Sequence, residues 1–198
     1  MTPSPVDHEA RRERLTRVLL ALVAERGLEG ASVRAVASAA GVSIGTVQHY
    51  FRSKDEMLLF AFRQTGSDLT ERAERIARRA LTVRAAIRGI LLELLPLDAR
   101  REAEARVGIA FAAHAMTAPR LAAVLRDDLD ELRRELTDAF AQAKVADPHR
   151  AASAAMALVD GLATQLLFGS DAFGEDDAIA VLDAHLQHAL ARPRRGRA

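Results

Sequence analysis

The sequence predicts an all-α protein of about nine helices, in which a three-helix N-terminal domain precedes a larger helical bundle. Three observations predict this fold class. Apolar residues recur at spacings of three and four over most of the 198 residues, as they do on the buried face of a helix. Glycines, prolines and capping residues separate these stretches. No segment alternates polar and apolar residues as a half-buried strand would.

The first predicted helix ends at Gly27 and Gly30, because glycine commonly terminates helices. Its buried face is formed by Leu15, Val18, Leu19, Leu22 and Val23. Beyond residue 53 the same signals predict six further helices. These cover residues 54 to about 77, 82–95, 98–116, 119–144, 147–168 and 175–191.

The segment from Ser32 to Phe51 is predicted to form a helix-turn-helix. Ser32 and Ser43 are favourable N-caps for its two short helices, and Gly41 ends the first of them. Only Gly41, Val42 and Ser43 join the helices, so the helices must cross sharply. This arrangement is typical of proteins that place the second helix in the DNA major groove.

The second helix of this motif presents a polar surface. In a helix that begins at Ile44, Val47 and Phe51 lie four residues apart and face inward together with Val42. The outward positions are Gly45, Thr46, Gln48, His49 and Tyr50. The Gln48 amide can pair with adenine. The outer face therefore suits base readout.

Other polar residues around the motif suit the DNA backbone. Tyr50 and Lys54 can contact phosphates, and Ser32 and Arg34 lie at a helix N-terminus, where the helix dipole favours an anion. The alternative is that both helices belong to an ordinary bundle whose polar residues only face solvent.

Charge and composition narrow the class of protein. Up to Lys54 there are eight Lys and Arg against five Asp and Glu, whereas residues 55–191 carry 16 against 22. A basic first segment suits phosphate attraction. The absence of cysteine excludes disulfides and thiol chemistry. No run of 18 apolar residues and no signal peptide are evident, so a cytoplasmic protein without membrane contact is expected.

The stretch SVRAVASAAGVSIGTVQHYFRSKDEML resembles the N-terminal signature of the TetR family of regulators. The shared features are a Ser/Thr-Val-Arg opening, a Gly-Val-Ser turn, a His-Tyr-Phe ending and a following Ser-Lys-Asp/Glu. The resemblance covers roughly residues 11–60 and implies an all-α homodimer with a C-terminal effector pocket. It implies a DNA-binding domain over 8–53 and a ligand-binding and dimerisation domain over 54–191. The Arg-rich composition of residues 192–198 itself predicts a disordered tail.

The resemblance also implies roles for individual residues. Those facing base edges would be Ile44, Gly45, Thr46, Gln48 and His49, and those contacting phosphates Ser32, Ser43, Tyr50 and Lys54. Arg11, Arg12 and Arg14 would form a basic arm beside the first helix. Ile44 departs from the lysine, proline or arginine often found at its place, and Gln48 from a common tyrosine. The operator sequence of relatives is therefore not carried over.

The C-terminal part resembles the family more loosely. The segment from Asp160 to Ala163 is similar to the subgroup of the choline-responsive betaine-pathway repressor. An effector pocket is expected among apolar residues with a few polar ones, near Leu91, Leu95, Phe111, His114, Met116, Phe140 and Gln165. A four-helix dimer interface is expected from the last two helices, through Leu158, Leu162, Leu166, Leu182, Leu186 and Ala189. The alternative for each residue is simple core packing.

The predicted function is a ligand-relieved repressor that binds double-stranded, palindromic operator DNA as a homodimer and responds to an unknown small molecule. His185 and His188 share a helix face near Asp183, but three groups are few for a structural metal, and no metal or cofactor is expected. The alternatives are a small helical enzyme acting through its histidines and a protein-binding adaptor. No nucleophile motif, carboxylate dyad or phosphate-binding loop supports the enzyme.

Overall fold

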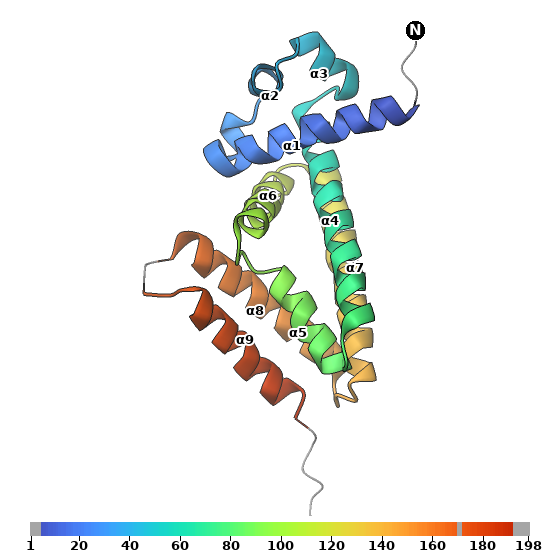
Figure 1. Ribbon diagram of the computed structural model, residues 1–198, viewed down its shortest axis with the longest axis vertical. Coiled ribbons are helices and arrows are strands. Elements are labelled where there is room, and N and C mark those ends of the chain that lie inside the picture. The colour runs from blue at the N-terminus through green and yellow to red at the C-terminus, as the bar shows by residue number, and fades with distance from the viewer. Residues whose placement is uncertain (1–4, 170–171, 192–198) are drawn as a thin grey trace, which may run out of the picture. The chain divides into compact units, whose positions relative to one another are not determined.

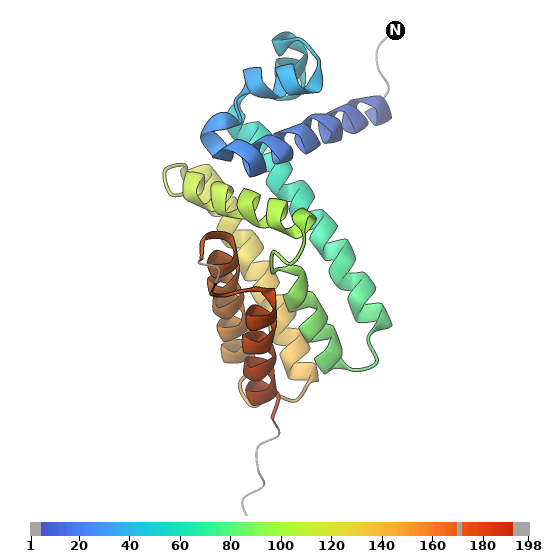
Figure 2. The same cartoon turned by 60° about the vertical axis from the view of Figure 1, so that its left-hand side comes forward.

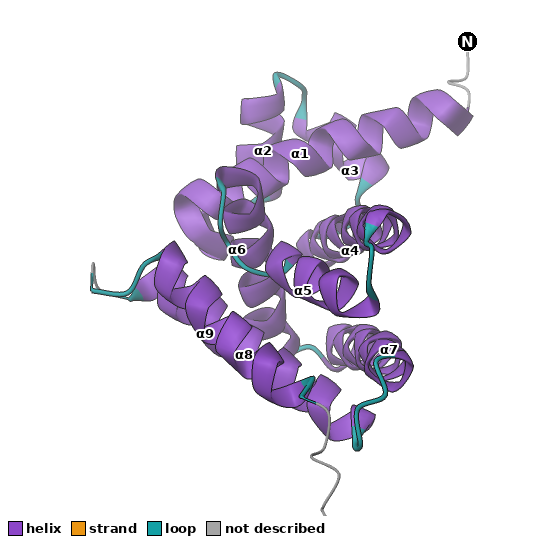
Figure 3. Ribbon diagram, turned by 60° about the horizontal axis from the view of Figure 1, so that its bottom comes forward, coloured by secondary structure: helices purple, strands orange, loops and turns teal. Residues whose placement is uncertain are grey.

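The computed structural model describes residues 5–169 and 172–191, and in these residues it contains nine helices and no strand (Figures 1 and 3). The predicted fold class is therefore confirmed. The helices are α1 (Pro5–Gly30), α2 (Val33–Ala40), α3 (Ile44–Tyr50), α4 (Lys54–Arg79), α5 (Val83–Glu93), α6 (Ala99–Ala115), α7 (Pro119–Gln142), α8 (Pro148–Phe168) and α9 (Glu175–Ala189). The tail predicted over 192–198 lies outside the described residues.

Local capping chemistry sets most helix ends. The side chains of Ser32, Ser43, Thr82 and Asp147 each accept a hydrogen bond from the backbone N–H three residues later, as N-caps do. Within α1 the backbone breaks at Gly27, where φ is 69° and ψ is 180°. The helix end predicted at Gly27 is thus an interruption of the helical backbone, and α1 continues beyond it to Gly30.

The chain forms two compact units. The first contains the residues up to Asp68 together with Glu102–Ala123, and the second contains Leu69–Arg101 and the residues from Val124 onward. The domain boundary predicted after residue 53 lies inside the first unit, because the start of α4 and most of α6 pack with α1, α2 and α3 there. The boundary between functional domains stays a prediction.

The core of the first unit joins five helices. The rings of Phe62 on α4 and Phe111 on α6 stack with centroids 4.0 Å apart and planes at 5°. This stack fastens α6 to α4. The other buried apolar residues of the unit include Leu15, Leu19, Leu22 and Val23 of α1, Val36, Ala37 and Ala40 of α2, Val47 of α3, and Met57, Leu58 and Ala61 of α4.

The second unit is built mainly from α5, α7, α8 and α9, with α8 and α9 side by side (Figures 1 and 2). Its core includes Ile87, Leu91, Leu136, Phe140 and Leu182, each at most 2% exposed. These residues come from α5, α7 and α9, and α8 adds its own buried face. The apolar residues that recur at helical spacing in the sequence are the ones that pack together in this core.

One helix among the described residues, α8, is long and apolar enough to cross a membrane by length and mean hydropathy alone. Its Ala152, Ala155 and Val159 nevertheless lie in the core of the second unit, as in a core helix. Only 28% of its most apolar 18-residue window is buried within the chain. Leu158, Leu166 and Leu167 of this helix are half-buried, and Ala154, Ala157 and Gly161 are exposed.

Two arginines of α5 fasten α9. Arg84 donates to the carbonyl oxygen of Leu190 at 2.5 Å. Arg88 binds both carboxylate oxygens of Asp183, from Nε at 2.5 Å and from Nη2 at 3.0 Å. Hydrogen bonding from Arg88 holds the pKa of Asp183 below its usual value.

Replacing Asp183→Asn is expected to lower the free energy of unfolding by about 0.5–1 kcal/mol at pH 7, because the pair is bidentate but partly exposed. Because the pKa of Asp183 is lower in the native than in the unfolded state, the ionised carboxylate stabilises the fold fully above the unfolded pKa of about 3.9. This stabilisation is lost as the pH falls through the native pKa. Urea unfolding at pH 7, 4 and 3 should therefore show the difference from wild type shrinking in acid. Asp138→Asn, on the exposed side of α7, is the control. A difference that persists unchanged at pH 3 would contradict this role.

Replacing Gly41→Ala is expected to destabilise the protein by about 1–2 kcal/mol, because φ is +67° in the turn between α2 and α3. A Cβ atom there meets nothing within 4 Å, so the cost comes from the backbone alone. Gly41→Asn is the matched control, since asparagine tolerates the left-handed conformation better and should cost less. Thermal and urea unfolding measure both; an alanine variant as stable as wild type would refute the argument.

Candidate DNA-binding site

The third helix is held from beneath by two side chains. Val47 and Phe51 are fully buried at 0% exposure, and Val42 in the preceding turn is half-buried. The N–H of Phe51 donates to the carbonyl of Val47 at 2.9 Å and ends the helix. The inward positions predicted from the sequence are therefore confirmed.

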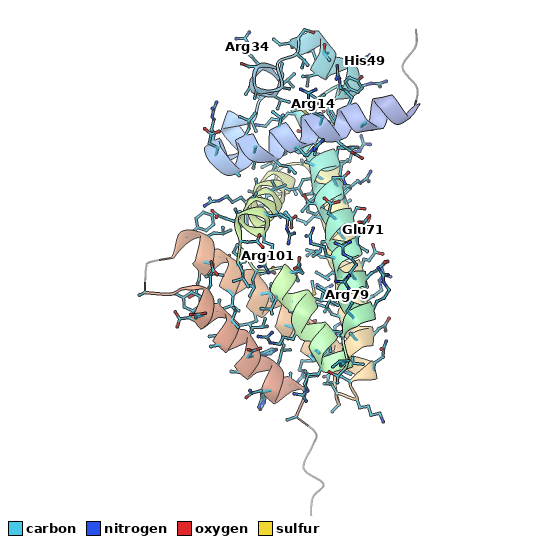
Figure 4. The ribbon with its side chains drawn as sticks, viewed as in Figure 1. Arg14, Arg34, His49, Glu71, Arg79 and Arg101 are labelled. Atoms are coloured by element: carbon cyan, nitrogen blue, oxygen red, sulfur yellow. The ribbon has the colours of Figure 1, made fainter. Side chains whose placement is uncertain are left out.

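The opposite face of α3 is open to solvent. Ile44, Gly45, Gln48 and His49 are exposed. The other two predicted outward residues, Thr46 and Tyr50, are half-buried. The rings of His49 and Tyr50 pack edge to face with centroids 5.1 Å apart. At the neighbouring helix starts, Ser32 and Arg34 are exposed and Lys54 is half-buried (Figure 4 labels Arg34 and His49). Base contact and phosphate contact by these residues stay predictions.

The turn before α3 has a defined hydrogen-bond pattern. Gly41 takes the left-handed conformation, and its N–H donates to the carbonyl of Ser38 at 3.2 Å. The N–H of Val42 donates to the carbonyl of Ala37 at 3.0 Å. Together these bonds satisfy carbonyls at the end of α2 and aim the chain into α3.

The Ser43 hydroxyl has a structural task of its own. Its oxygen accepts from the N–H of Thr46 at 3.0 Å, and it lies 2.8 Å from the Thr46 hydroxyl oxygen. Ser32 caps α2 in the same way, accepting from the N–H of Ala35 at 3.1 Å. A phosphate contact from either serine would add to this capping role rather than replace it.

The start of α4 is tied to α1 through one arginine. The Arg12 guanidinium lies over the rings of Phe51 and Phe60, 5.1 Å and 4.3 Å from their centroids. It also lies 3.7 Å from Glu56, whose carboxylate accepts from the backbone N–H of Arg52 at 2.7 Å. Arg12 thus packs on two aromatic rings within the unit, and its part in a basic arm stays a prediction.

Arg11 and Arg14, the other two arginines of that arm, are exposed. Nothing in the spacing of the sequence separates Arg12 from them, because all three lie in one short basic run. Arg12 differs from its basic neighbours because it lies over the rings of Phe51 and Phe60, and only the tertiary structure brings these rings to it.

His114, which is predicted to line an effector pocket, contacts the start of α4. His114, near the end of α6, places Nε2 2.8 Å from the carboxylate of Asp55 in the first turn of α4. This contact lies beside Lys54, a predicted phosphate anchor. Together with the stacked Phe62 and Phe111, it fixes α6 against the α4 segment that follows the helix-turn-helix.

The structure does not gather the predicted pocket residues around one cavity of either unit. Leu91, Leu95 and Phe140 fill the core of the second unit, and Gln165 is exposed on α8. Met116 belongs to the first unit and is 87% exposed. Two cavities found in the second unit are lined by other residues.

The predicted interface residues divide in two groups. Leu162, Leu182 and Leu186 are buried within their own chain, at 2%, 0% and 4% exposure, so they support the surface of α8 and α9 from inside. Leu158, Leu166 and Ala189 are half-buried. A dimer interface through α8 and α9 stays a prediction.

No group of three or more metal-ligating side chains occurs in the part of the chain that the structure describes. Near the histidine pair, Asp183 is held by Arg88, and burial and the neighbouring His188 keep the pKa of His185 below its usual value. The Nε2 atom of His185 is buried without a hydrogen-bond partner.

The chain matches known protein families in both its N-terminal and its C-terminal part. Residues 15–60 match the family described as "Bacterial regulatory proteins, tetR family", and residues 83–191 match "BetI-type transcriptional repressor, C-terminal". The transcriptional regulator PksA of Bacillus subtilis is 32% identical over 189 residues, which cover 93% of this chain and 92% of that protein.

Solved structures are similar over the same length. A transcriptional regulator from Rhodococcus sp. Rha1 superposes with a TM-score of 0.83 and 38% identity, over 92% of this chain and 99% of that one. A regulator from Saccharomonospora viridis in complex with choline superposes with a TM-score of 0.85 over 91% and 97%, and its 22% identity supports the fold alone. These relatives are regulators rather than enzymes. The chain belongs to the TetR family of DNA-binding transcriptional regulators, with a C-terminal part of the BetI type.

Proposed function

We propose that this regulator is a repressor that binds a palindromic operator as a homodimer and leaves it when a small-molecule effector binds. It acts in the cytoplasm. The observation that carries the proposal is the exposed face of α3, which is mounted on buried Val47 and Phe51 and reached through a rigid turn. A short helix fixed in this way can enter a major groove without rearranging.

The chemistry of the exposed face supports base readout. Gln48 offers both a donor and an acceptor, which match the adenine edge in the major groove. Gly45 adds no side chain, and its position lets the backbone approach the bases closely. Ile44 is 40% exposed and offers an apolar contact to a thymine methyl group. Thr46 and His49 complete the proposed base-reading set.

The positions around α3 support contact with the DNA backbone. Arg34 is exposed in the first turn of α2, next to the exposed cap Ser32. Lys54 begins α4, and Tyr50 ends α3. Each can place a donor or a positive charge against a phosphate, and these contacts set affinity and register rather than sequence preference.

The uncovered face of α8 supports a homodimer. Ala154, Ala157 and Gly161 are exposed along it, and Phe168 at its end is 63% exposed. Val181 on α9 is 41% exposed. Small residues beside large exposed apolar ones let two helix pairs pack closely, and a twofold-symmetric dimer matches a palindromic operator.

Release by an effector is supported by the relatives rather than by a cavity of this chain. The C-terminal part matches a repressor type, and the Saccharomonospora viridis regulator holds choline. The residues that would bind the effector stay a prediction from the sequence. The test is whether a small molecule, with choline as the first candidate, lowers operator affinity and raises the melting temperature of the free protein.

Two substitutions should separate base readout from phosphate contact. Gln48→Ala is expected to weaken binding to the DNA upstream of the protein's own gene by about 10-fold, since one bidentate base contact is lost. Binding to unrelated DNA should stay unchanged. Lys54→Ala should weaken both and reduce the slope of log affinity against log salt by about 1. Fluorescence anisotropy at several salt concentrations measures these effects.

Thermal unfolding of both variants checks that the fold is intact. If Gln48→Ala leaves sequence-specific binding at full strength, Gln48 takes no part in base readout. If the wild-type protein binds the DNA upstream of its gene no better than unrelated DNA, the operator proposal is contradicted.

A charge placed on α8 should break the proposed dimer. Ala157→Arg is expected to shift the protein from dimer to monomer in sedimentation equilibrium, because an unpaired guanidinium would be buried between the copies. Ala157 is exposed in the single chain, so the substitution should not disturb the core of the protomer. Asp138→Arg on α7 is the control and should leave the dimer intact. A wild-type protein that sediments as a monomer, or an Ala157→Arg dimer of undiminished stability, would refute the interface.

A further inference from the structure

An arginine-lined groove, formed by the C-terminal part of α4 and by α5, lies within the second unit. Its volume is about 440 Å³, which is within the size range of small-molecule sites. Arg72, Arg75 and Arg79 of α4 line it, and the remaining lining is apolar apart from Glu93 of α5. Figure 4 labels Arg79 on α4, with Glu71 two turns earlier. None of these residues has a role in the proposed DNA contacts or dimer.

The three arginines share one face of α4. Their spacings of three, four and seven residues place them on one side of a helix. Like charges at such spacings destabilise a helix slightly, so helix stability does not explain why three arginines lie together on this face. It is also set in a segment that is acidic overall, with 22 Asp and Glu against 16 Lys and Arg over residues 55–191.

The carboxylate in the groove is already engaged. Oε2 of Glu93 accepts from Arg72 Nε at 2.8 Å and from Arg100 Nη2 at 3.0 Å. The side chains of Arg72 and Glu93 are only 14% and 18% exposed, so this pair is a fixed part of the wall. One carboxylate shared by two guanidinium groups does not neutralise Arg75 and Arg79 as well.

Arg75 and Arg79 remain available at the mouth of the groove. Arg75 approaches Glu71 only to 3.7 Å, and both side chains are exposed, so this ion pair is weak. Arg79 has no ion pair with any carboxylate in residues 5–169 and 172–191. Arg78 beside it points to a different partner, Glu74, at 3.1 Å and does not line the groove.

The apolar lining results from a close approach of the two helices. A Cβ atom on Gly89 of α5 would lie 2.7 Å from Cγ2 of Ile76, so only glycine lets α5 come this near to α4. Ile76 of α4, Ala80 directly after the end of α4, and Ala85 of α5 then line the groove beside this contact. The result is an apolar surface next to two available guanidinium groups.

We propose that this groove binds a small organic anion, whose phosphate or carboxylate group contacts Arg75 and Arg79 and whose short apolar part packs on Ile76 and Ala80. Guanidinium groups bind both kinds of oxyanion through paired N–H donors. The same charges disfavour a cation. The groove is therefore distinct in chemistry from a site for choline.

The proposal concerns binding by the protein alone and does not depend on release from DNA. It goes beyond the proposed repressor function, and either can fail while the other holds. Whether an anion bound here alters operator affinity is a separate measurement from whether it binds.

Isothermal titration of the full-length protein with hexyl phosphate and with hexanoate tests the site, with hexan-1-ol and choline as uncharged and cationic controls. We expect a dissociation constant of about 1 mM or lower for the better anion. The stronger of the two anions identifies the head group. Arg75→Gln and Arg79→Gln should each weaken binding about 5-fold, and the double variant about 20-fold.

Arg78→Gln is the matched control, because Arg78 shares the last turn of α4 and its favourable position near the helix C-terminus but lies outside the groove. It should change affinity less than about 2-fold. Circular dichroism melts establish that the three variants fold. The proposal is overturned if neither anion binds saturably, if hexan-1-ol or choline binds as well as the anions, or if Arg78→Gln weakens binding as much as Arg79→Gln.

Discussion

The DNA-binding unit depends on the burial of Phe51, the residue that both ends α3 and leads into α4. Its ring meets Phe60 edge to face with centroids 5.6 Å apart, and the Arg12 guanidinium of α1 lies over it. Its N–H closes the last turn of α3. Because α3 has only seven residues, it is too short to be stable by itself, and tertiary packing must hold it. Phe51 and Val47 are the two side chains that supply this packing.

The same unit extends well beyond the helix-turn-helix. The stacked Phe62 and Phe111 and the contact between His114 and Asp55 bind α6 to the first half of α4, directly after the recognition element. The helix α4 runs without interruption from Lys54 to Arg79, and its residues divide between the two compact units. The first half of α4 therefore belongs with the helix-turn-helix, and its second half with the C-terminal bundle.

The helices and their caps were predictable from sequence because the signals are local: Ser32, Ser43, Thr82 and Asp147 act on backbone groups three residues away. The inward residues of α3 followed from helical spacing for the same reason. Contacts between distant segments carry no such signal. Arg12 resembles its basic neighbours until Phe51 and Phe60 are placed beside it. The effector pocket stays a prediction for the same reason, since apolar spacing indicates burial but does not distinguish a cavity wall from filled core, as the buried Leu91 and Phe140 illustrate.

The division of α3 into a buried and an exposed side has a consequence for how such a regulator diversifies. Ile44, Gly45 and Gln48 are exposed, whereas the packing of the helix rests on Val47 and Phe51. Under the proposed readout, substitutions at the three exposed positions change what the helix recognises at little cost in stability. Selection can redirect such a protein to a new target sequence in single steps, without passing through unfolded intermediates.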